Sequence, residues 1–200
     1  MLTLVHSPQT RSSRFIWLLE ELGVPYELKR VTIRRGDGSG EIDSNNPHPH
    51  GKVPVLIHGG ESIFESIAIA LYLTDLHPEA DMGPPVGDPL RGRYLTWLAY
   101  YAGVLEPAFV SKFMNFSPPR GTAGWVAADE AMPQVVKRLE AGPYLLGEKF
   151  SAVDTLYIDV RVVPRQSAIA GNAVVARLRQ PLHRTTGVRA CCREGLIDSP

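Results

Sequence analysis

Cysteine and long apolar runs are scarce in this chain of 200 residues. The two cysteines, Cys191 and Cys192, are adjacent and near the end, so the sequence shows no disulfide framework and fits a reducing compartment. No apolar run approaches the roughly 18 residues that a membrane-spanning helix needs. The N-terminus also lacks a basic region followed by a long apolar one. We therefore expect a cytoplasmic protein that has no membrane partner.

The formal net charge is zero at pH 7, but the charges are unevenly distributed. Residues 161–200 contain seven arginines and only two acidic residues, Glu194 and Asp198, and the first 160 residues carry the compensating negative charge. These arginines are dispersed and have no aromatic residues among them, unlike a typical nucleic-acid-binding surface. We interpret them as solvated surface and expect no nucleic-acid partner.

Hydrophobic periodicity predicts alternating strands and helices in the first 78 residues. The predicted elements, in order, are a strand at 2–6, a helix at 14–22, a strand at 26–31, a surface connection at 34–46, a β-hairpin at 55–64 and a helix capped by Ser66. Gly23 is the stop signal of the first helix, and a serine at the start of the second is a common cap. This order matches a thioredoxin-like layer of four strands with helices packed on it.

The second half of the sequence predicts helices only. Apolar residues form a stripe on a long helix, at positions Tyr94, Leu95, Leu98, Tyr101, Ala102 and Leu105. A second helix is predicted at 125–139, where Pro133 is either a kink or a boundary. Ser151 followed by Asp154 resembles a capping box that begins another helix.

These patterns predict an α/β thioredoxin-like N-terminal domain followed by an all-α C-terminal domain. The N-terminal domain comprises residues 1–78, a proline-rich linker residues 79–88, and the helical domain residues 89–200. Pro164 and Pro181 interrupt the expected helices in the last forty residues, which are therefore atypical.

A bend and a proline precede the predicted hairpin, in the stretch Asn46-Pro47-His48-Pro49-His50-Gly51-Lys52-Val53-Pro54-Val55-Leu56. Pro54 removes one backbone donor just before a strand, which leaves the amide and carbonyl of Val53 available to a ligand. The alternative is a proline that only begins an edge strand. An X-Pro bond in a tight turn is also where cis peptides occur, although the sequence leaves the isomer open. Together with the helix start at Glu65-Ser66, this stretch predicts a cradle for a small anionic peptide.

Several strings, in this order, resemble the glutathione S-transferase family, bacterial branch. They are His6-Ser7-Pro8 and Arg11-Ser12-Ser13-Arg14 before Trp17-Leu18-Leu19-Glu20-Glu21-Leu22-Gly23, then Asn46-Pro47 with Gly51-Lys52-Val53-Pro54-Val55-Leu56, then Phe64-Glu65-Ser66-Ile67, and finally Tyr144-Leu145-Leu146-Gly147 with Phe150-Ser151-Ala152-Val153-Asp154. The resemblance covers residues 2 to about 160. It implies glutathione as co-substrate, a homodimer and a role in detoxification.

The resemblance also implies roles in glutathione binding for six residues. The helix start at Ser66 would bind the γ-glutamyl carboxylate through its amide and hydroxyl, and Glu65 would hold the ligand amine. The main chain of Val53, held by Pro54, would pair with the cysteinyl backbone as an added strand. Lys52 or His50 would meet the glycine carboxylate. The alternatives are a plain helix cap at Ser66 and a solvated side chain at Lys52.

Glutathione chemistry requires a thiolate, and a thiol of pKa near 8.5 is only a few per cent ionised at pH 7. A hydroxyl donor near the start of the first helix would stabilise the thiolate, and the loop there offers Ser7, Thr10, Ser12 and Ser13. We favour Ser12, the expected helix cap, followed by Thr10. The alternative is that both hydroxyls only satisfy backbone amides. Arg11 stands near the position where another branch of the family has cysteine.

Histidines at positions 48, 50 and 58 suggest a metal site, but no acidic or cysteine partner lies close in sequence, so we expect no metal. The resemblance instead implies a glutathione transferase acting on small hydrophobic electrophiles. The electrophile would lie against the first long C-terminal helix, where the available aromatic residues are Tyr100, Tyr101, Phe109 and Phe113; these are also candidates for core or dimer interface. Two alternatives remain: a glutathione-dependent disulfide reductase or peroxidase, and a non-catalytic relative used for protein contacts.

Overall fold

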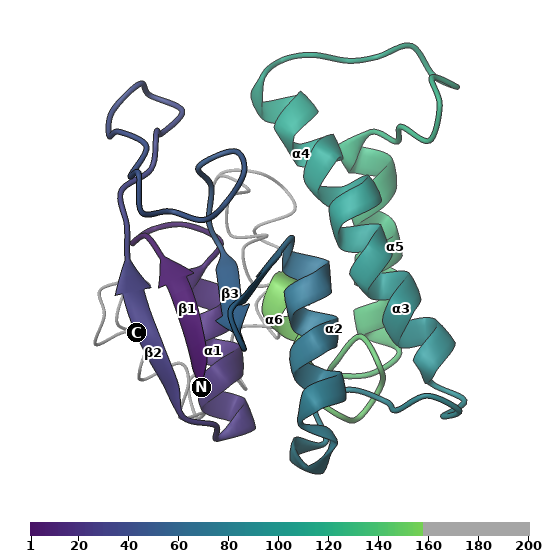
Figure 1. Ribbon diagram of the computed structural model, residues 1–200. Coiled ribbons are helices and arrows are strands. Elements are labelled where there is room, and N and C mark those ends of the chain that lie inside the picture. The colour runs from purple at the N-terminus through teal and green to yellow at the C-terminus, as the bar shows by residue number, and fades with distance from the viewer. Residues whose placement is uncertain (158–200) are drawn as a thin grey trace, which may run out of the picture. The chain divides into compact units, whose positions relative to one another are not determined.

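The computed structural model describes residues 1–157 of the chain (Figure 1). These residues divide into two compact units, 1–80 and 81–157. The predicted helix breaks at Pro164 and Pro181 and the dispersed arginines lie outside the described residues. No helix within residues 1–157 combines the length and apolar character that crossing a bilayer requires.

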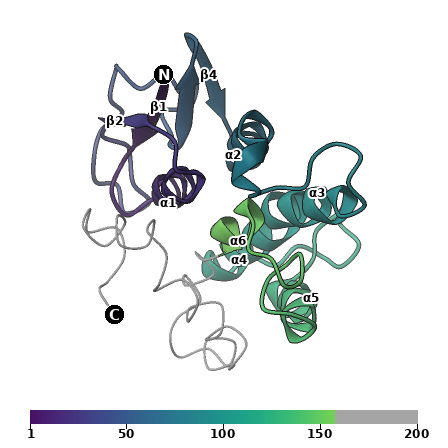
Figure 2. The same cartoon turned by 90° about the horizontal axis from the view of Figure 1, so that it is seen from below.

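The first unit is a four-stranded sheet with two helices on one face (Figure 2). Its elements are β1 (Leu2–His6), α1 (Ser13–Leu22), β2 (Tyr26–Arg30), β3 (Val55–His58), β4 (Glu61–Phe64), α2 (Ser66–Leu76) and a 3₁₀ turn (Pro78–Ala80). The strand order is β2-β1-β3-β4; β1 and β2 run parallel, and the other two pairs run antiparallel. The predicted thioredoxin-like fold is confirmed.

The core of this unit lies between the central strand β1 and the helices. Leu4 and Val5 of β1 have no exposed surface, and neither do Phe15 and Leu18 of α1. Gly23 ends α1 in the left-handed conformation, with φ of 68°, as its position in the sequence predicted. The segment 31–54 forms no regular helix or strand, in agreement with the predicted surface connection.

The second unit is helical. Its elements are α3 (Arg91–Tyr100), a π-helical turn (Tyr101–Leu105), α4 (Glu106–Phe113), α5 (Ala128–Glu140) and α6 (Ala152–Tyr157). Because Pro107 has no N–H, the regular hydrogen bond to Gly103 is lost, and the N–H of Glu106 instead donates to the carbonyl of Tyr101. The helix thus continues past the proline by widening one turn.

The apolar stripe predicted on this helix is confirmed, with one exception. Tyr94, Leu98, Tyr101 and Leu105 are buried and Ala102 is half-buried, whereas Leu95 is 40% exposed. Successive side chains on a helix point about 100° apart, so when Tyr94 faces the core, Leu95 points away from it. Of the aromatic residues considered for an electrophile site, Tyr101 belongs to the core, and Tyr100 donates a hydrogen bond to the carbonyl of Ala131 at 3.2 Å. Phe113 is 82% exposed.

Two predicted helix starts were wrong. The helix α5 begins at Ala128 rather than at Trp125. Trp125 instead closes a turn, in which its N–H donates to the carbonyl of Thr122 at 3.0 Å. Pro133 lies inside α5 and does not end it. The cap of α2 is Glu65, with φ of 71°, and Ser66 is the first helical residue. Only Glu65 separates β4 from α2, so the whole change of direction falls on that residue.

The predicted pairing of Ser151 with Asp154 at the start of α6 is confirmed, in the half of the capping box in which the acid reaches back to the serine N–H. One oxygen of Asp154 accepts the N–H and the hydroxyl of Ser151 at 2.9 and 3.0 Å, and the other accepts the N–H of Leu145 at 2.9 Å. Asp154 is 3% exposed, and this burial raises its pKa to about 6 against the opposing effect of the hydrogen bonds. Asp154 therefore ties the preceding loop to the helix start.

We expect Asp154→Ala to lower the free energy of unfolding by about 2–4 kcal/mol, because it leaves two buried amides without their acceptor. Urea unfolding measures this change. Asp154→Asn keeps one of the two oxygen acceptors and cannot titrate, so it should lose less stability than Asp154→Ala and serves as the comparison variant.

The pKa of Asp154 is higher in the folded chain than its ordinary value of 3.8, so the folded state binds the proton more tightly. The wild type should therefore lose stability relative to Asp154→Asn as the pH rises from about 4 to 6. A stability difference that does not change over this range would contradict the assignment.

Candidate functional site

A cluster of buried polar side chains fills the turn between β1 and α1. The hydroxyl of Ser12 lies 2.7 Å from Nδ1 of His6 and 2.6 Å from Oγ1 of Thr10. The N–H of Ser7 donates to the Ser12 hydroxyl at 3.3 Å, and the Thr10 hydroxyl donates to the carbonyl of Ser7 at 2.7 Å. His6 and Ser12 have no exposed surface.

The local sequence explains this arrangement. His6 ends the central strand, where its carbonyl accepts the N–H of Val31 at 2.9 Å. The chain then turns through Gln9, whose φ of 57° reverses its direction, and returns to α1. Ser12 occupies the cap position of α1 as predicted, but its hydroxyl makes no bond to the first-turn amides and points inward to His6 instead.

Of the two favoured hydroxyls, Thr10 is the one that a ligand can reach. Thr10 is partly exposed, whereas the 0% exposure of Ser12 leaves no surface for direct contact. On exposure alone, Thr10 is the better placed of the two to meet a ligand directly, with Ser12 behind it, and the assignment of the acting hydroxyl stays a prediction.

A second group of residues belongs to the loop before β3, which Asn46 and His48 organise. The side-chain oxygen of Asn46 accepts the N–H of His48 at 3.0 Å, and its amide donates to the carbonyl of Lys52 at 3.1 Å. Nδ1 of His48 accepts the N–H of His50 at 3.0 Å, and its ring centroid lies 5.2 Å from that of Phe64. These contacts give an otherwise irregular segment a defined conformation.

Gly51 stands at the tightest point of this loop. Its φ is +59°, and an added Cβ would come within 2.6 Å of Cγ2 of Ile42. Only glycine fits both the backbone angle and the space. The exposed connection at 34–46 thus packs onto the turn before β3.

The peptide bond between Val53 and Pro54 is cis. Val53 lies outside the strand pairing, which begins at Val55 opposite Val5 of β1. Its side chain is half-buried and packs against a cluster formed by Val5, Val31 and Val55. The side chain is thereby fixed while the main chain lies at the end of the sheet.

The register of the sheet brings most of the predicted site residues to one edge. Val5 of β1 pairs with Val55 of β3, which pairs in turn with Phe64 of β4. The residues that follow Val5, precede Val55 and follow Phe64 must therefore lie at the same end of the sheet. These residues are Thr10 and Ser12, Val53 and Pro54, and Glu65 and Ser66.

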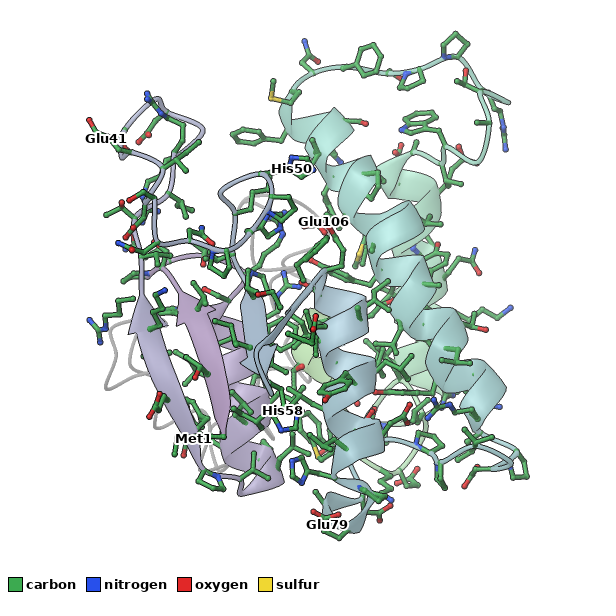
Figure 3. The ribbon with its side chains drawn as sticks, viewed as in Figure 1. Met1, Glu41, His50, His58, Glu79 and Glu106 are labelled. Atoms are coloured by element: carbon green, nitrogen blue, oxygen red, sulfur yellow. The ribbon has the colours of Figure 1, made fainter. Side chains whose placement is uncertain are left out.

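His50 and Lys52 are exposed on the loop at this end. Figure 3 shows His50 beyond one end of β3 and His58 at the other end, where His58 pairs with Leu2. The sheet therefore separates His58 from His48 and His50, whose ring centroids lie 5.8 Å apart. Within residues 1–157, no three histidine, cysteine or acidic side chains gather as metal ligands would.

Two residues that sequence reasoning did not assign to the site are in contact with predicted site residues: His6 with Ser12, and His48 with His50. His6 ends a buried strand directly before the hydroxyl-rich loop, and that position is the sequence signal by which it could have been found. Burial lowers the pKa of His48, with His50 and Lys52 acting in the same direction and Glu65 opposing them. Glu65 is therefore close enough to His48 to interact electrostatically.

Comparison with known proteins relates this chain to glutathione S-transferases. Residues 1–75 match the N-terminal domain family of glutathione S-transferases. Glutathione S-transferase 4 of Zea mays is 33% identical over 159 residues, which are 71% of this chain and 67% of that protein. The disulfide-bond oxidoreductase YfcG of Escherichia coli is 29% identical over 169 residues, or 77% of this chain and 76% of the relative. Glutathione S-transferase 3 of Schizosaccharomyces pombe is 40% identical over 73 residues, 36% of this chain, but the match spans only 29% of its length.

Solved structures similar to this fold include further glutathione transferases. A glutathione transferase from Methylococcus capsulatus superposes with a TM-score of 0.77 and 29% identity, covering 98% of this chain and 100% of the other. A sphingomonad glutathione S-transferase complexed with glutathione gives a TM-score of 0.75 at 26% identity, with the same coverage.

We expect the loop around His48 to loosen in acid. Its Nδ1 accepts a hydrogen bond, so protonation places a proton against the N–H of His50. The folded pKa lies below the ordinary 6.5, so the unfolded chain takes up the proton first and stability falls as the pH drops through that value.

Urea unfolding between about pH 7 and 5 measures this effect, with His48→Asn as the control because its oxygen replaces the acceptor without titrating. The wild type should lose stability relative to His48→Asn as the pH falls. Parallel pH curves for the two proteins would refute the role given to His48.

Proposed function

We propose, because this chain belongs to the glutathione S-transferase family, that it binds glutathione at the edge of its N-terminal sheet and transfers it to small apolar electrophiles. The observation that carries this proposal is the position of the Thr10–Ser12 hydroxyl pair at the same sheet edge as Val53 and the start of α2. The proposed glutathione-binding domain is the predicted segment 1–78.

Six residues supply the proposed binding groups for glutathione. Ser66, in the first turn of the 11-residue helix α2, offers its amide and hydroxyl to the γ-glutamyl carboxylate, where the helix dipole favours negative charge. The exposed carboxylate of Glu65 pairs with the ligand amine. Val53, preceding Pro54 and outside the strand ladder, pairs through its main chain with the cysteinyl unit. The exposed Lys52 or the exposed His50 meets the glycine carboxylate.

The proposed chemistry is attack by a thiolate. The glutathione thiol releases its proton to solvent, and the Thr10 hydroxyl donates a hydrogen bond to the resulting sulfur anion. The sulfur electron pair then forms a bond to an electrophilic carbon, and the leaving group departs with its electron pair. Lowering the thiol pKa by about two units requires roughly 2.7 kcal/mol, which a charge-assisted hydrogen bond together with a helix N-terminus supplies.

A disulfide reductase on the same scaffold is the second candidate. It is favoured by the likeness to a protein named as a disulfide-bond oxidoreductase. Residues 7–13, the loop between β1 and α1, contain no cysteine. This loop therefore has no thiol that could form a mixed disulfide with glutathione. A non-catalytic role in protein contacts is the third candidate. The homodimer and the cytoplasmic location stay predictions.

Turnover should separate these candidates. We expect conjugation of a chloronitrobenzene to exceed reduction of an organic peroxide and of a mixed glutathione disulfide. Faster reduction of either would favour the second candidate. No turnover by a folded chain would favour the third.

Thr10→Val removes the proposed donor and keeps the side-chain shape. We expect it to raise the pKa of bound glutathione by one to two units and to lower kcat/KM at neutral pH by about 10- to 100-fold. The thiolate absorbance, titrated against pH, measures the pKa. Val110→Thr, a change of the same size on the exposed side of α4, is the control for isosteric exchange; an unshifted pKa in Thr10→Val would exclude the Thr10 mechanism.

Ser66→Ala tests the binding of the γ-glutamyl carboxylate. We expect the dissociation constant for glutathione, measured by calorimetry, to rise about tenfold, equivalent to about 1.4 kcal/mol, because one of the charge-assisted hydrogen bonds is lost. Ser62→Ala on the exposed strand β4 is the matched control and should bind as the wild type does. No heat of binding by the folded wild type at millimolar glutathione would overturn the proposed function itself.

A further inference from the structure

The hydroxyl cluster behind Thr10 has a definite direction of hydrogen bonding. The carbonyl of Ser7 can only accept, so its 2.7 Å contact with the Thr10 hydroxyl requires Thr10 to donate. The Thr10 proton is then committed, and the 2.6 Å contact between Thr10 and Ser12 requires Ser12 to donate to Thr10. The remaining 2.7 Å contact, between Ser12 and Nδ1 of His6, is left for His6 to donate.

The Ser12 hydroxyl also lies 3.3 Å from the carbonyl of Ser7, but its 2.6 Å contact with Thr10 is much shorter, so its one proton is assigned to Thr10. The other contacts fit this direction. The Ser12 oxygen also accepts the N–H of Ser7 at 3.3 Å, so with His6 both of its lone pairs are used. The Thr10 oxygen likewise accepts the N–H of Ser12 at 3.3 Å as well as the Ser12 hydroxyl. The reverse direction would leave a hydroxyl oxygen 2.7 Å from a carbonyl oxygen with no proton between them, which is unfavourable.

We propose that His6 is a positioning residue for thiolate formation: its Nδ1–H fixes the direction of the chain from His6 through Ser12 to Thr10, so that the Thr10 proton is directed outward. The inference rests on the proposed function, in which Thr10 meets the glutathione sulfur. When glutathione binds, the Thr10 hydroxyl turns from the Ser7 carbonyl to the sulfur anion, whose negative charge makes it the stronger acceptor and offsets the lost bond to the carbonyl. The two bonds behind it stay as they are. No bond other than hydrogen bonds forms or breaks.

The burial of His6 explains why a histidine at this position is effective. With 0% exposure at both His6 and Ser12, solvent does not reach these two groups in competition with the chain. Successive hydrogen bonds of the same direction polarise one another, so Thr10 becomes a better donor than an isolated hydroxyl. If His6 carried its only proton on Nε2, Ser12 would have to donate to Nδ1 and Thr10 to Ser12, and no proton would be left for the sulfur.

The test compares His6→Leu with His6→Asn in the full chain. Leucine cannot donate, whereas the side-chain amide of asparagine carries an N–H at nearly the position of Nδ1. We expect His6→Leu to raise the pKa of bound glutathione by about one unit, and His6→Asn to restore it to within a few tenths of the wild-type value. Circular dichroism and the dissociation constant of glutathione show that each variant remains folded and binds.

Coupling to Ser12 separates a hydrogen-bond chain from a packing effect. Once Ser12→Ala has broken the chain, adding His6→Leu should leave the thiol pKa at the value of Ser12→Ala alone. An additive further rise would overturn the proposal. So would an unshifted pKa in His6→Leu when Thr10→Val raises it.

A measurement on the wild type covers the case in which His6→Leu fails to fold. Nitrogen chemical shifts of the His6 imidazole distinguish its tautomers, and we expect protonated Nδ1. A ring protonated only at Nε2 overturns the inference and leaves the proposed function standing. If the wild type neither binds glutathione nor lowers its thiol pKa, the proposed function fails instead, whatever the tautomer.

Discussion

The candidate site depends on one constraint: the polar groups buried at the end of β1 must find their hydrogen bonds inside the protein. Ser12 has no contact with solvent, and an unmet buried hydroxyl costs about 1–3 kcal/mol. Its proton and lone pairs are therefore assigned to fixed neighbours. That assignment gives the partly exposed Thr10 a defined donor direction, which a loop freely hydrated by water would not have.

The sheet converts this local order into a site. Val5, Val55 and Phe64 pair across three strands, so a shift of one residue in either pairing would move the loop before β3 or the start of α2 away from the hydroxyls. The apolar contacts that set this register lie in the core. Stability and ligand geometry thus depend on the same pairing, and substitutions in β1 or β3 are expected to affect both.

Local signals in the sequence sufficed for most elements of the fold. The alternation of strands and helices, the glycine after α1, the hairpin at 55–64 and the pairing of Ser151 with Asp154 each depend on residues within a few positions of one another. Sequence reasoning failed where a neighbouring element decided the local structure. Ser66 is the first helical residue rather than the cap because β4 ends only one residue before it. The inward turn of Ser12 depends on His6, whose position beneath the loop only the folded strand defines.

The close approach of Gly51 to Ile42 links two stretches of chain that are otherwise easily treated as separate. The exposed connection at 34–46 looks like a natural place for insertions or for grafting a foreign peptide. Shortening or replacing it would withdraw Ile42 from the turn that precedes β3, and with it a support for His50 and Lys52. Protein engineering on this scaffold should therefore keep residues 42–51 together, unchanged, and vary only the part of the connection around Asp37.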